Sequence, residues 1–421
     1  MLKEIPPSDL QIGMFIHKMK GSWFDHPFWK SKFLIDDQEK LKVLKSSALT
    51  SLIIDTSLGK DIQDTQDNSP PRGADATAGT AAARRMKSIR TRQSSSQAIS
   101  LPVSTSAEVG AAQALSENAS AKLKDMFMAA RVGRAISVST IVPVVSDIHA
   151  SIRRNSQAFN GLMRCKLRNE VVYRHSLCVS ALMISLARKM KLSGQVTVDA
   201  GRAGLLLDLG TSYYPHSIEP PEGDFSRLDP EIWEQHVMLG HRAIKYDDTI
   251  SDWVLDTCLH HHERLDGTGF PGGLKGEDIS LGGRMAAICD TFDFLLTGGG
   301  ATTALDPATA VTALREMDGA FDPDILRKFV ESVGQFPIGS FVRLQSEKVA
   351  MVIDENPDDP SHPIVEAFFD LAEGKRVPQH RVKLGIGFDE DEILESADLS
   401  GLDLPDEPYL REVTFLAAHR R

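Results

Sequence analysis

Residues 260–297 read HHHERLDGTGFPGGLKGEDISLGGRMAAICDTFDFLLT, and this stretch decides the fold and the chemistry of the chain. Three consecutive histidines, His260, His261 and His262, stand at the predicted end of one helix. A loop rich in glycine and proline follows, and then a long apolar segment that predicts a buried helix carrying Asp290. A lone histidine is usually structural, but adjacent histidines beside such a loop indicate a metal site.

Further candidate ligands lie in helices before this stretch. His175 opens the predicted helix HSLCVSALMISLARKMKL, and His236 lies in the helix that begins at Asp229 and Pro230. Asp208 interrupts the apolar run LLLDLG, where a carboxylate is expensive to bury without a cation or strong donors. Each of these residues could be a hydrogen-bonded structural residue. Together they fit imidazole and carboxylate ligands arranged inside a helical bundle.

The donor types restrict the chemistry. Histidine and aspartate without a thiolate suit iron or manganese, and zinc less exclusively. An aspartate shared between two ions is a common way to hold a metal pair, and such a pair can activate water for attack on a phosphodiester. The residues alone therefore predict a metal-dependent hydrolase of phosphate esters.

Composition excludes several classes of protein. The 421 residues include 47 Lys+Arg and 58 Asp+Glu, so the net charge of 47 − 58 = −11 disfavours DNA and acidic membranes as bulk partners. Four scattered cysteines without a CxxC pair indicate a reducing compartment. No window reaches the roughly 18 apolar residues that span a bilayer. We therefore expect a cytoplasmic protein without a membrane span.

The chain divides into five predicted segments. We expect a small α+β domain over 1–58, a disordered linker over 59–106 and a helical domain over 107–340. A small segment that contains β-strands is predicted over 341–385, and a poorly fixed acidic tail over 386–421. The fold class is thus mainly α, a helical bundle with two small β-containing parts.

From His175 to Leu344 the chain resembles the HD-GYP family, bacterial signalling phosphodiesterases that hydrolyse cyclic di-GMP. HHE followed by DGTGFPGGLKG carries the resemblance. Residues 21–35, GSWFDHPFWKSKFLI, are similar to an uncharacterised N-terminal domain often fused to such units. The resemblance implies an HD-domain helical bundle, one or two divalent ions, most often iron or manganese, and cyclic di-GMP or a related dinucleotide as partner.

The resemblance also implies roles for individual residues. One ion would be held by Asp208, His236, His261 and His262, and a second by His175, Asp208 and Asp290 with the histidine of the family's His-Asp doublet. Asp208 is the predicted catalytic residue. The substrate-binding residues implied by the loop and the remaining cations are Gly269, Phe270, Pro271, Lys275 and Arg284.

Several positions depart from the family pattern. The doublet reads Leu207-Asp208, so the second site loses a ligand, and Val171 stands where some members have a third-metal glutamate. Thr211 replaces a phosphate-binding lysine, and Phe270 replaces the tyrosine of GYP. The chain also has no Lys or Arg between Arg284 and Arg315, where the family grips the other phosphate. Each lost charged hydrogen bond would weaken binding by about 1.5–3 kcal/mol.

Three functions fit these observations. The first is metal-dependent hydrolysis of cyclic di-GMP or its linear dinucleotide product, impaired by Leu207 and the missing basic residues. The alternative is a non-catalytic module that binds cyclic di-GMP or signalling proteins. The third is an HD-type hydrolase with a different nucleotide substrate.

Overall fold

The structure, a computed structural model, describes residues 2–20, 33–35, 38–46, 51–60, 102–134, 136–166, 171–218, 225–299, 303–385 and 390–420. The chain forms two compact units, Met1–Ser100 and Leu101–Arg421, and each is described by itself. Most of the linker predicted over 59–106 lies outside the described residues. Its last two residues, 105 and 106, already belong to the first helix of the second unit.

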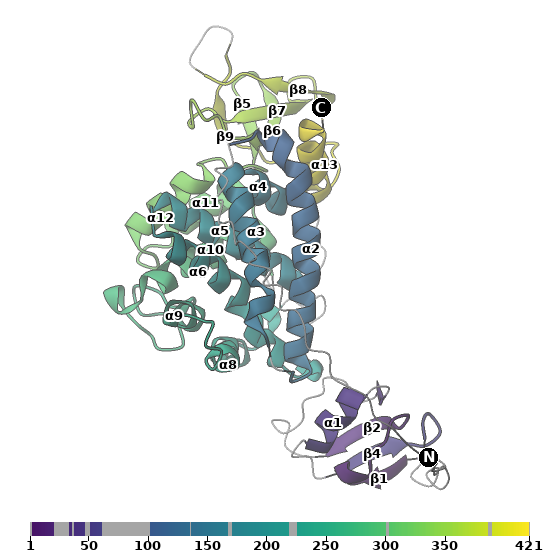
Figure 1. Ribbon diagram of the computed structural model, residues 1–421. Coiled ribbons are helices and arrows are strands. Elements are labelled where there is room, and N and C mark those ends of the chain that lie inside the picture. Colours follow the sequence, from purple (N-terminus) through teal and green to yellow (C-terminus); the bar gives the residue numbers. More distant parts are fainter. Residues whose placement is uncertain are drawn as a thin grey trace, which may run out of the picture. The chain divides into compact units, whose positions relative to one another are not determined.

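The N-terminal unit is the expected small α+β domain (Figure 1). Its antiparallel sheet has the order β1-β4-β2-β3. One helix, α1 (Gln38–Ser46), comes before β4 in the sequence. Burial alternates along β4, where Leu52 and Ile54 face the core, as expected for a sheet covered on one face. The strands are β1 (Leu2–Ile5), β2 (Phe15–Lys20), β3 (Phe33–Leu34) and β4 (Ser51–Asp55).

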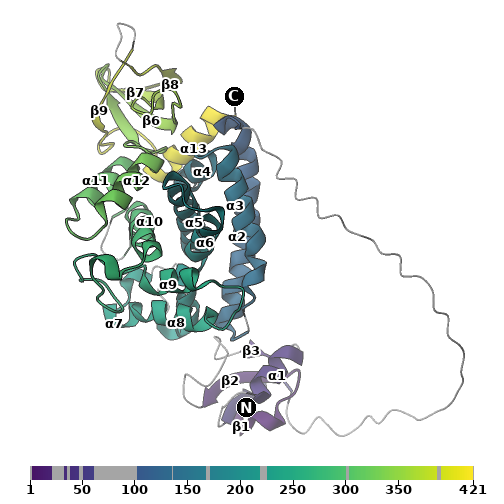
Figure 2. The ribbon, with the colours of Figure 1, turned by 60° about the vertical axis from the view of Figure 1, so that its left-hand side comes forward.

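The second unit is mainly α, as predicted, and its helices surround α5 (Figures 1 and 2). Residues 176–187 of α5 are all buried, which identifies it as the central helix of the bundle. The α-helices of this bundle are α2 (Thr105–Arg131), α3 (Val142–Arg154), α4 (Ala158–Cys165), α5 (Val171–Lys189), α6 (Gly194–Leu206), α7 (Pro230–Trp233), α8 (Gln235–Ile244), α9 (Asp252–His260), α10 (Leu281–Thr297), α11 (Pro307–Glu316) and α12 (Pro323–Val333).

Several helices begin at the residues that the sequence indicates. Asp229 accepts a hydrogen bond from the Glu231 N–H at the start of α7, with Pro230 as the first helical residue. Asp322 caps α12 in the same way. At α9 the cap is Ser251, whose hydroxyl accepts a hydrogen bond from the Val254 N–H.

A close approach between two segments positions the functional side chains. After α6 the chain tightens into a 3₁₀ turn, Leu207–Tyr213, which carries Asp208. A Cβ at Gly210 would lie 1.8 Å from the His236 carbonyl oxygen, so only glycine lets this turn pack against α8. Asp208 is thereby held beside His236.

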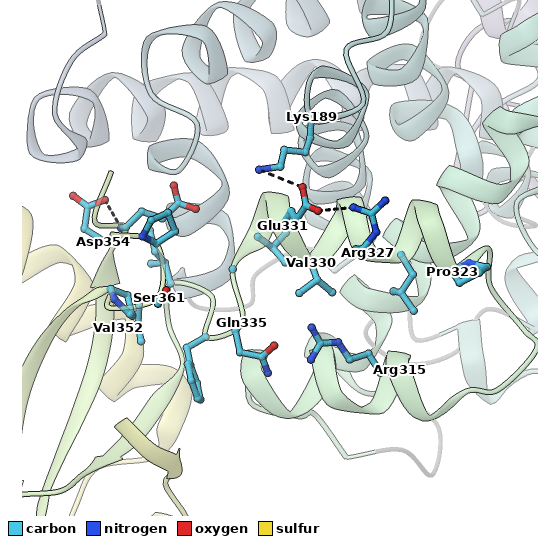
Figure 3. A pocket seen from close by; sticks show the side chains of 18 residues that line it. Lys189, Arg315, Pro323, Arg327, Val330, Glu331, Gln335, Val352, Asp354 and Ser361 are labelled. Carbon is cyan, nitrogen blue, oxygen red and sulfur yellow. Dashed lines mark hydrogen bonds and ion pairs between the residues drawn. The ribbon is translucent and has the colours of Figure 1, made fainter. Parts of the chain in front are cut away.

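The C-terminal part adds a five-stranded antiparallel sheet of order β8-β7-β6-β5-β9. A groove of about 700 Å³ runs between this sheet and the bundle, lined by α12 and by β6 with the residues that follow it (Figure 3). Glu331 in this groove pairs with Arg327 at 2.8 Å and with Lys189 at 3.8 Å. The strands are β5 (Phe341–Leu344), β6 (Lys348–Asp354), β7 (Ile364–Asp370), β8 (Lys375–Val382) and β9 (Ile393–Ser396).

The prediction of a poorly fixed tail over 386–421 is wrong. Residues 393–396 form β9 and pair with β5, and residues 407–419 form helix α13. Leu410, Thr414, Phe415 and Ala418 are buried on one face of α13, which packs against α2, α4 and β6. This helical spacing of buried residues outweighs the acidic composition that suggested disorder.

We expect Phe415→Ala to destabilise the second unit by about 3–5 kcal/mol, because it deletes a ring that is 0% exposed. Urea unfolding followed by circular dichroism would measure the change. Tyr409→Ala, on the same helix but 48% exposed, is the control and should stay within about 0.5 kcal/mol. Equal effects of the two substitutions would contradict the docking of α13.

Candidate metal centre

Three histidine side chains, one from α8 and two from the turn after α9, converge in the bundle. His236 Nε2, near the start of α8, lies 3.3 Å from His261 Nε2 and 3.2 Å from His262 Nε2, both just after α9. One donor atom from each of the three residues lies within 4.8 Å of the others. His236 and His261 are 0% exposed, so neither ring faces bulk solvent.

Backbone hydrogen bonds set the tautomers of two of these rings. His236 Nδ1 donates to the Trp233 carbonyl at 2.6 Å, and His261 Nδ1 donates to the Cys258 carbonyl at 2.9 Å. Burial lowers the pKa of His236 to about 4 and also lowers the pKa values of His261 and His262, so the rings are neutral. The unprotonated Nε2 atoms of His236 and His261 then face each other, and facing lone pairs fit a bound cation.

Three further donors complete the centre. His175 Nε2, on α5, lies 3.0 Å from Asp290 Oδ1 on α10 and 3.3 Å from Asp208 Oδ2. Asp208 reaches His236 Nε2 with its other oxygen at 3.5 Å, and Asp290 Oδ2 lies 3.7 Å from His262 Nδ1. Each carboxylate therefore lies between His175, which forms one half of the centre, and the three clustered histidines, which form the other half. All six predicted metal ligands are thus brought together.

Asp293 is a participant that the sequence analysis missed. It lies one turn after Asp290 on α10 and accepts a hydrogen bond from His175 Nδ1 at 2.8 Å. Burial opposes charge on His175, but hydrogen bonds to Asp290 and Asp293 and the charge of Asp208 raise its pKa well above the usual value. The i, i+3 spacing of Asp290 and Asp293 in a buried helix is the signal that could have found it.

The loop after the histidines is tied down by Glu263. Its carboxylate, 1% exposed, accepts hydrogen bonds from the Gly272 N–H at 2.6 Å and the Leu274 N–H at 2.9 Å. A Cβ at Gly269 would meet the Arg264 nitrogen and the His262 oxygen, each at 2.4 Å, so the loop folds directly onto the histidine turn. This stacks the Phe270 ring on His262, with ring centres 4.6 Å apart and an angle of 29° between the ring planes.

The other predicted substrate-binding residues occupy different positions. Pro271 is exposed in the loop beside Phe270, and the exposed Lys275 lies over Gly267. Arg284 Nη1 forms an ion pair with Asp322 Oδ2 at 2.8 Å, so its guanidinium is directed to the start of α12. Arg264 lies nearer the centre, since its Nη2 donates to the hydroxyl of Thr291, the neighbour of Asp290.

Two positions that depart from the family pattern are buried. Leu207 is 1% exposed and belongs to the apolar core of the bundle. Thr211 is also buried, and its hydroxyl donates to the Asp208 carbonyl at 2.7 Å. A further residue outside the predicted set, Trp233, stacks on His236 with ring centres 4.1 Å apart. The sequence carries no signal for this stacking beyond the three-residue spacing.

Comparisons with known proteins agree with this architecture. Residues 2–141 match a domain of unknown function, DUF3391, and residues 150–325 match the HD domain. The chain is 37% identical over 399 residues to the cyclic di-GMP phosphodiesterase PA4108 of Pseudomonas aeruginosa, which covers 94% of this chain and 92% of that protein.

Two further similarities are weaker. The cyclic di-GMP phosphodiesterase PdeB of Borreliella burgdorferi is 23% identical over 45% of this chain and 50% of its own length. The solved structure of Bd1817, an HDG"Y"P protein of Bdellovibrio bacteriovorus, is 18% identical, with a TM-score of 0.44 over 79% of this chain and 99% of that one. Among the described residues, no helix combines the length and apolarity needed to cross a bilayer.

Adding Mn²⁺ to metal-free protein should raise its melting temperature by roughly 5–10 °C at saturating concentrations, because the ion binds the folded state alone. His261→Ala should abolish this rise. The matched control is His260→Ala, because His260 pairs with Asp256 at 2.9 Å and is not one of the six donors. A rise that survives His261→Ala, or is lost equally in both variants, would contradict the assignment.

Proposed function

Because this chain belongs to the HD-GYP family, we propose that it hydrolyses a phosphodiester bond of cyclic di-GMP, or of its linear dinucleotide product, with the help of bound divalent ions. The observation that carries the proposal is the convergence of six histidine and aspartate donors on one buried point. The names of the two phosphodiesterase relatives supply the substrate class.

The six donors divide into two sets that share a carboxylate. His236, His261 and His262 with Asp208 would hold one ion, and His175, Asp208 and Asp290 would hold a second. Nitrogen and carboxylate donors without a thiolate favour iron or manganese. A bound divalent ion would supply Lewis-acid stabilisation of the negative charge on the phosphoryl group.

The protein's own residues would prepare the site for this chemistry. The Trp233 and Cys258 carbonyls hold two imidazoles with Nε2 directed inward, and Asp293 orients His175. Asp208 is the proposed catalytic residue because its two oxygens face both halves of the centre.

The loop held by Glu263 would receive the nucleotide. Phe270 stacks on His262 with one face of its ring. A guanine base would stack on the part of the ring that His262 leaves uncovered. Lys275, exposed on the loop, and Arg264, close to Asp290, are the cations suited to the substrate phosphates. Gly269 and Pro271 would shape this surface, whereas Arg284 is engaged by Asp322.

Leu207 favours the alternative, a non-catalytic module that binds cyclic di-GMP. Its side chain lies in the apolar core, so the second set has three protein donors instead of four. Gly298 and Gly299 follow α10, and this segment offers no basic side chain for the other phosphate. The lost metal donor weakens catalysis more than it weakens nucleotide binding through the loop, whereas the missing basic side chains weaken binding of the other phosphate.

Turnover decides between the two functions. With Mn²⁺ or Fe²⁺, the full chain should convert cyclic di-GMP to a linear product, detected by chromatography. Asp208→Asn should lower the rate by about 10³-fold, equivalent to about 4 kcal/mol, because both metal sets lose a charged donor. Asp256→Asn, whose carboxylate instead faces His260, is the control and should retain the rate. Binding of cyclic di-GMP without any product would support the alternative.

The number of bound ions tests the role of Leu207. Elemental analysis should find about one tightly bound ion per chain in the natural protein. Leu207→His should bring the number to about two and raise the rate, and adding Thr211→Lys should raise it further through phosphate binding. Two tightly held ions in the natural protein would show that Leu207 does not impair the second set.

A further inference from the structure

Tyr214 connects two of the segments that build the candidate metal centre. It directly follows the 3₁₀ turn Leu207–Tyr213 and is 5% exposed. Its hydroxyl donates to the Trp233 carbonyl oxygen at 2.7 Å and lies 2.9 Å from the Ile232 carbonyl oxygen. Both carbonyls stand at the end of α7, and the last carbonyls of a helix are available to side-chain donors.

The Trp233 carbonyl is the point where this hydroxyl meets a metal ligand. The same oxygen accepts the hydrogen bond of 2.6 Å from His236 Nδ1, which directs His236 Nε2 toward the other imidazoles. A carbonyl oxygen has two lone pairs, so it can accept from both donors at once. Tyr214 and His236 are therefore held by one atom.

Hydrogen bonds within the turn link Tyr214 to the second ligand. The Tyr214 N–H donates to the Thr211 carbonyl at 3.2 Å, and the Thr211 hydroxyl donates to the Asp208 carbonyl at 2.7 Å. Asp208 Oδ1 in turn lies 3.5 Å from His236 Nε2. These contacts form a closed circuit, whose members are Asp208, Thr211, Tyr214, Trp233 and His236. Because the circuit is closed, neither ligand can turn away without lengthening one of its contacts.

The Tyr214 phenol remains a hydrogen-bond donor at neutral pH. Burial and the negative charge of Asp208 raise its pKa above the ordinary value of a tyrosine. A phenolate would have no hydrogen to donate to the Trp233 carbonyl. The hydroxyl therefore keeps its role over the range in which His236, whose pKa is lowered to about 4, is neutral.

Aromatic packing holds the same region independently of the hydroxyl. The centres of the Tyr214 and Phe225 rings are 5.8 Å apart, and Phe225 stacks on Trp233 with ring centres 6.5 Å apart. Trp233 stacks in turn on His236 at 4.1 Å. A phenylalanine at position 214 would keep these ring contacts. Removal of the hydroxyl alone therefore tests the hydrogen bond and not the packing.

We infer that Tyr214 is a positioning residue of the candidate metal centre. Its hydroxyl fixes the Trp233 carbonyl, and that carbonyl fixes the direction of the His236 imidazole. Asp208 and His236 belong to the set with four protein donors, so Tyr214 supports the ion for which the chain offers most ligands. The inference rests on the proposed function only in requiring a divalent ion at this centre.

Titration of the metal-free full chain with Co²⁺ tests this role, because the visible absorption bands of bound Co²⁺ report the geometry of its ligands. Tyr214→Phe should weaken Co²⁺ binding about tenfold, as is typical when a residue that orients a metal ligand is lost. It should also change the absorption bands. The titrations are run at a temperature at which circular dichroism shows the metal-free variant to be fully folded.

Tyr213→Phe is the matched control. Tyr213 is the neighbouring residue in the chain, and its phenolic hydroxyl forms no hydrogen bond within the described part of the protein. This variant should bind Co²⁺ within about twofold of the natural protein and leave the absorption bands unchanged. An equal loss of affinity in both variants, or natural affinity in Tyr214→Phe, would overturn the inference.

Two further outcomes are decisive. Weaker binding by Tyr214→Phe with unchanged absorption bands would assign its effect to general stability, against a positioning role. Absence of Co²⁺ binding by the natural protein would remove the centre itself, and the inference with it.

Turnover of cyclic di-GMP separates this inference from the proposed function. If the natural chain binds Co²⁺ and Tyr214→Phe behaves as expected, but no product forms with Mn²⁺ or Fe²⁺, the proposed function fails and the role of Tyr214 stands. If product forms and Tyr214→Phe binds Co²⁺ like the natural chain, the role of Tyr214 fails alone.

Discussion

The structure depends on burying six histidine and aspartate donors inside an apolar helical bundle. Carboxylates such as Asp208 and Asp290 are expensive to bury, and neutral imidazoles facing each other are unfavourable, unless every polar atom has a partner. The bundle meets this demand with five segments, α5, the 3₁₀ turn after α6, α8, the end of α9, and α10. Their packing brings opposite charges and lone pairs to one point.

The surrounding atoms hold these donors as firmly as the helices do. Backbone carbonyls fix two imidazoles, Asp293 fixes a third, and the Glu263 carboxylate ties the following loop to the same turn. Gly210 permits the turn that carries Asp208 to reach α8. Preorganisation of this kind lets a metal bind without large rearrangement, because the orientation of the ligands is settled by folding.

The two halves of the centre are unequal, and the difference has a structural cause. Three imidazoles form one half, whereas His175 is the single imidazole of the other and Leu207 lies in the core. Asp293 hydrogen-bonds this single imidazole and also attracts the buried guanidinium of Arg174.

The sequence by itself determined the mainly α fold and the two small sheets, because helical and strand periodicities are local signals. The six candidate donors were predicted from the loop motif and the family resemblance that it carries. The structure alone decided that Asp293 fixes His175, that Arg284 belongs to Asp322, and that α13 and β9 complete the second unit. These contacts join residues far apart in the chain, and their energy depends on burial and distance, which only packing in three dimensions sets.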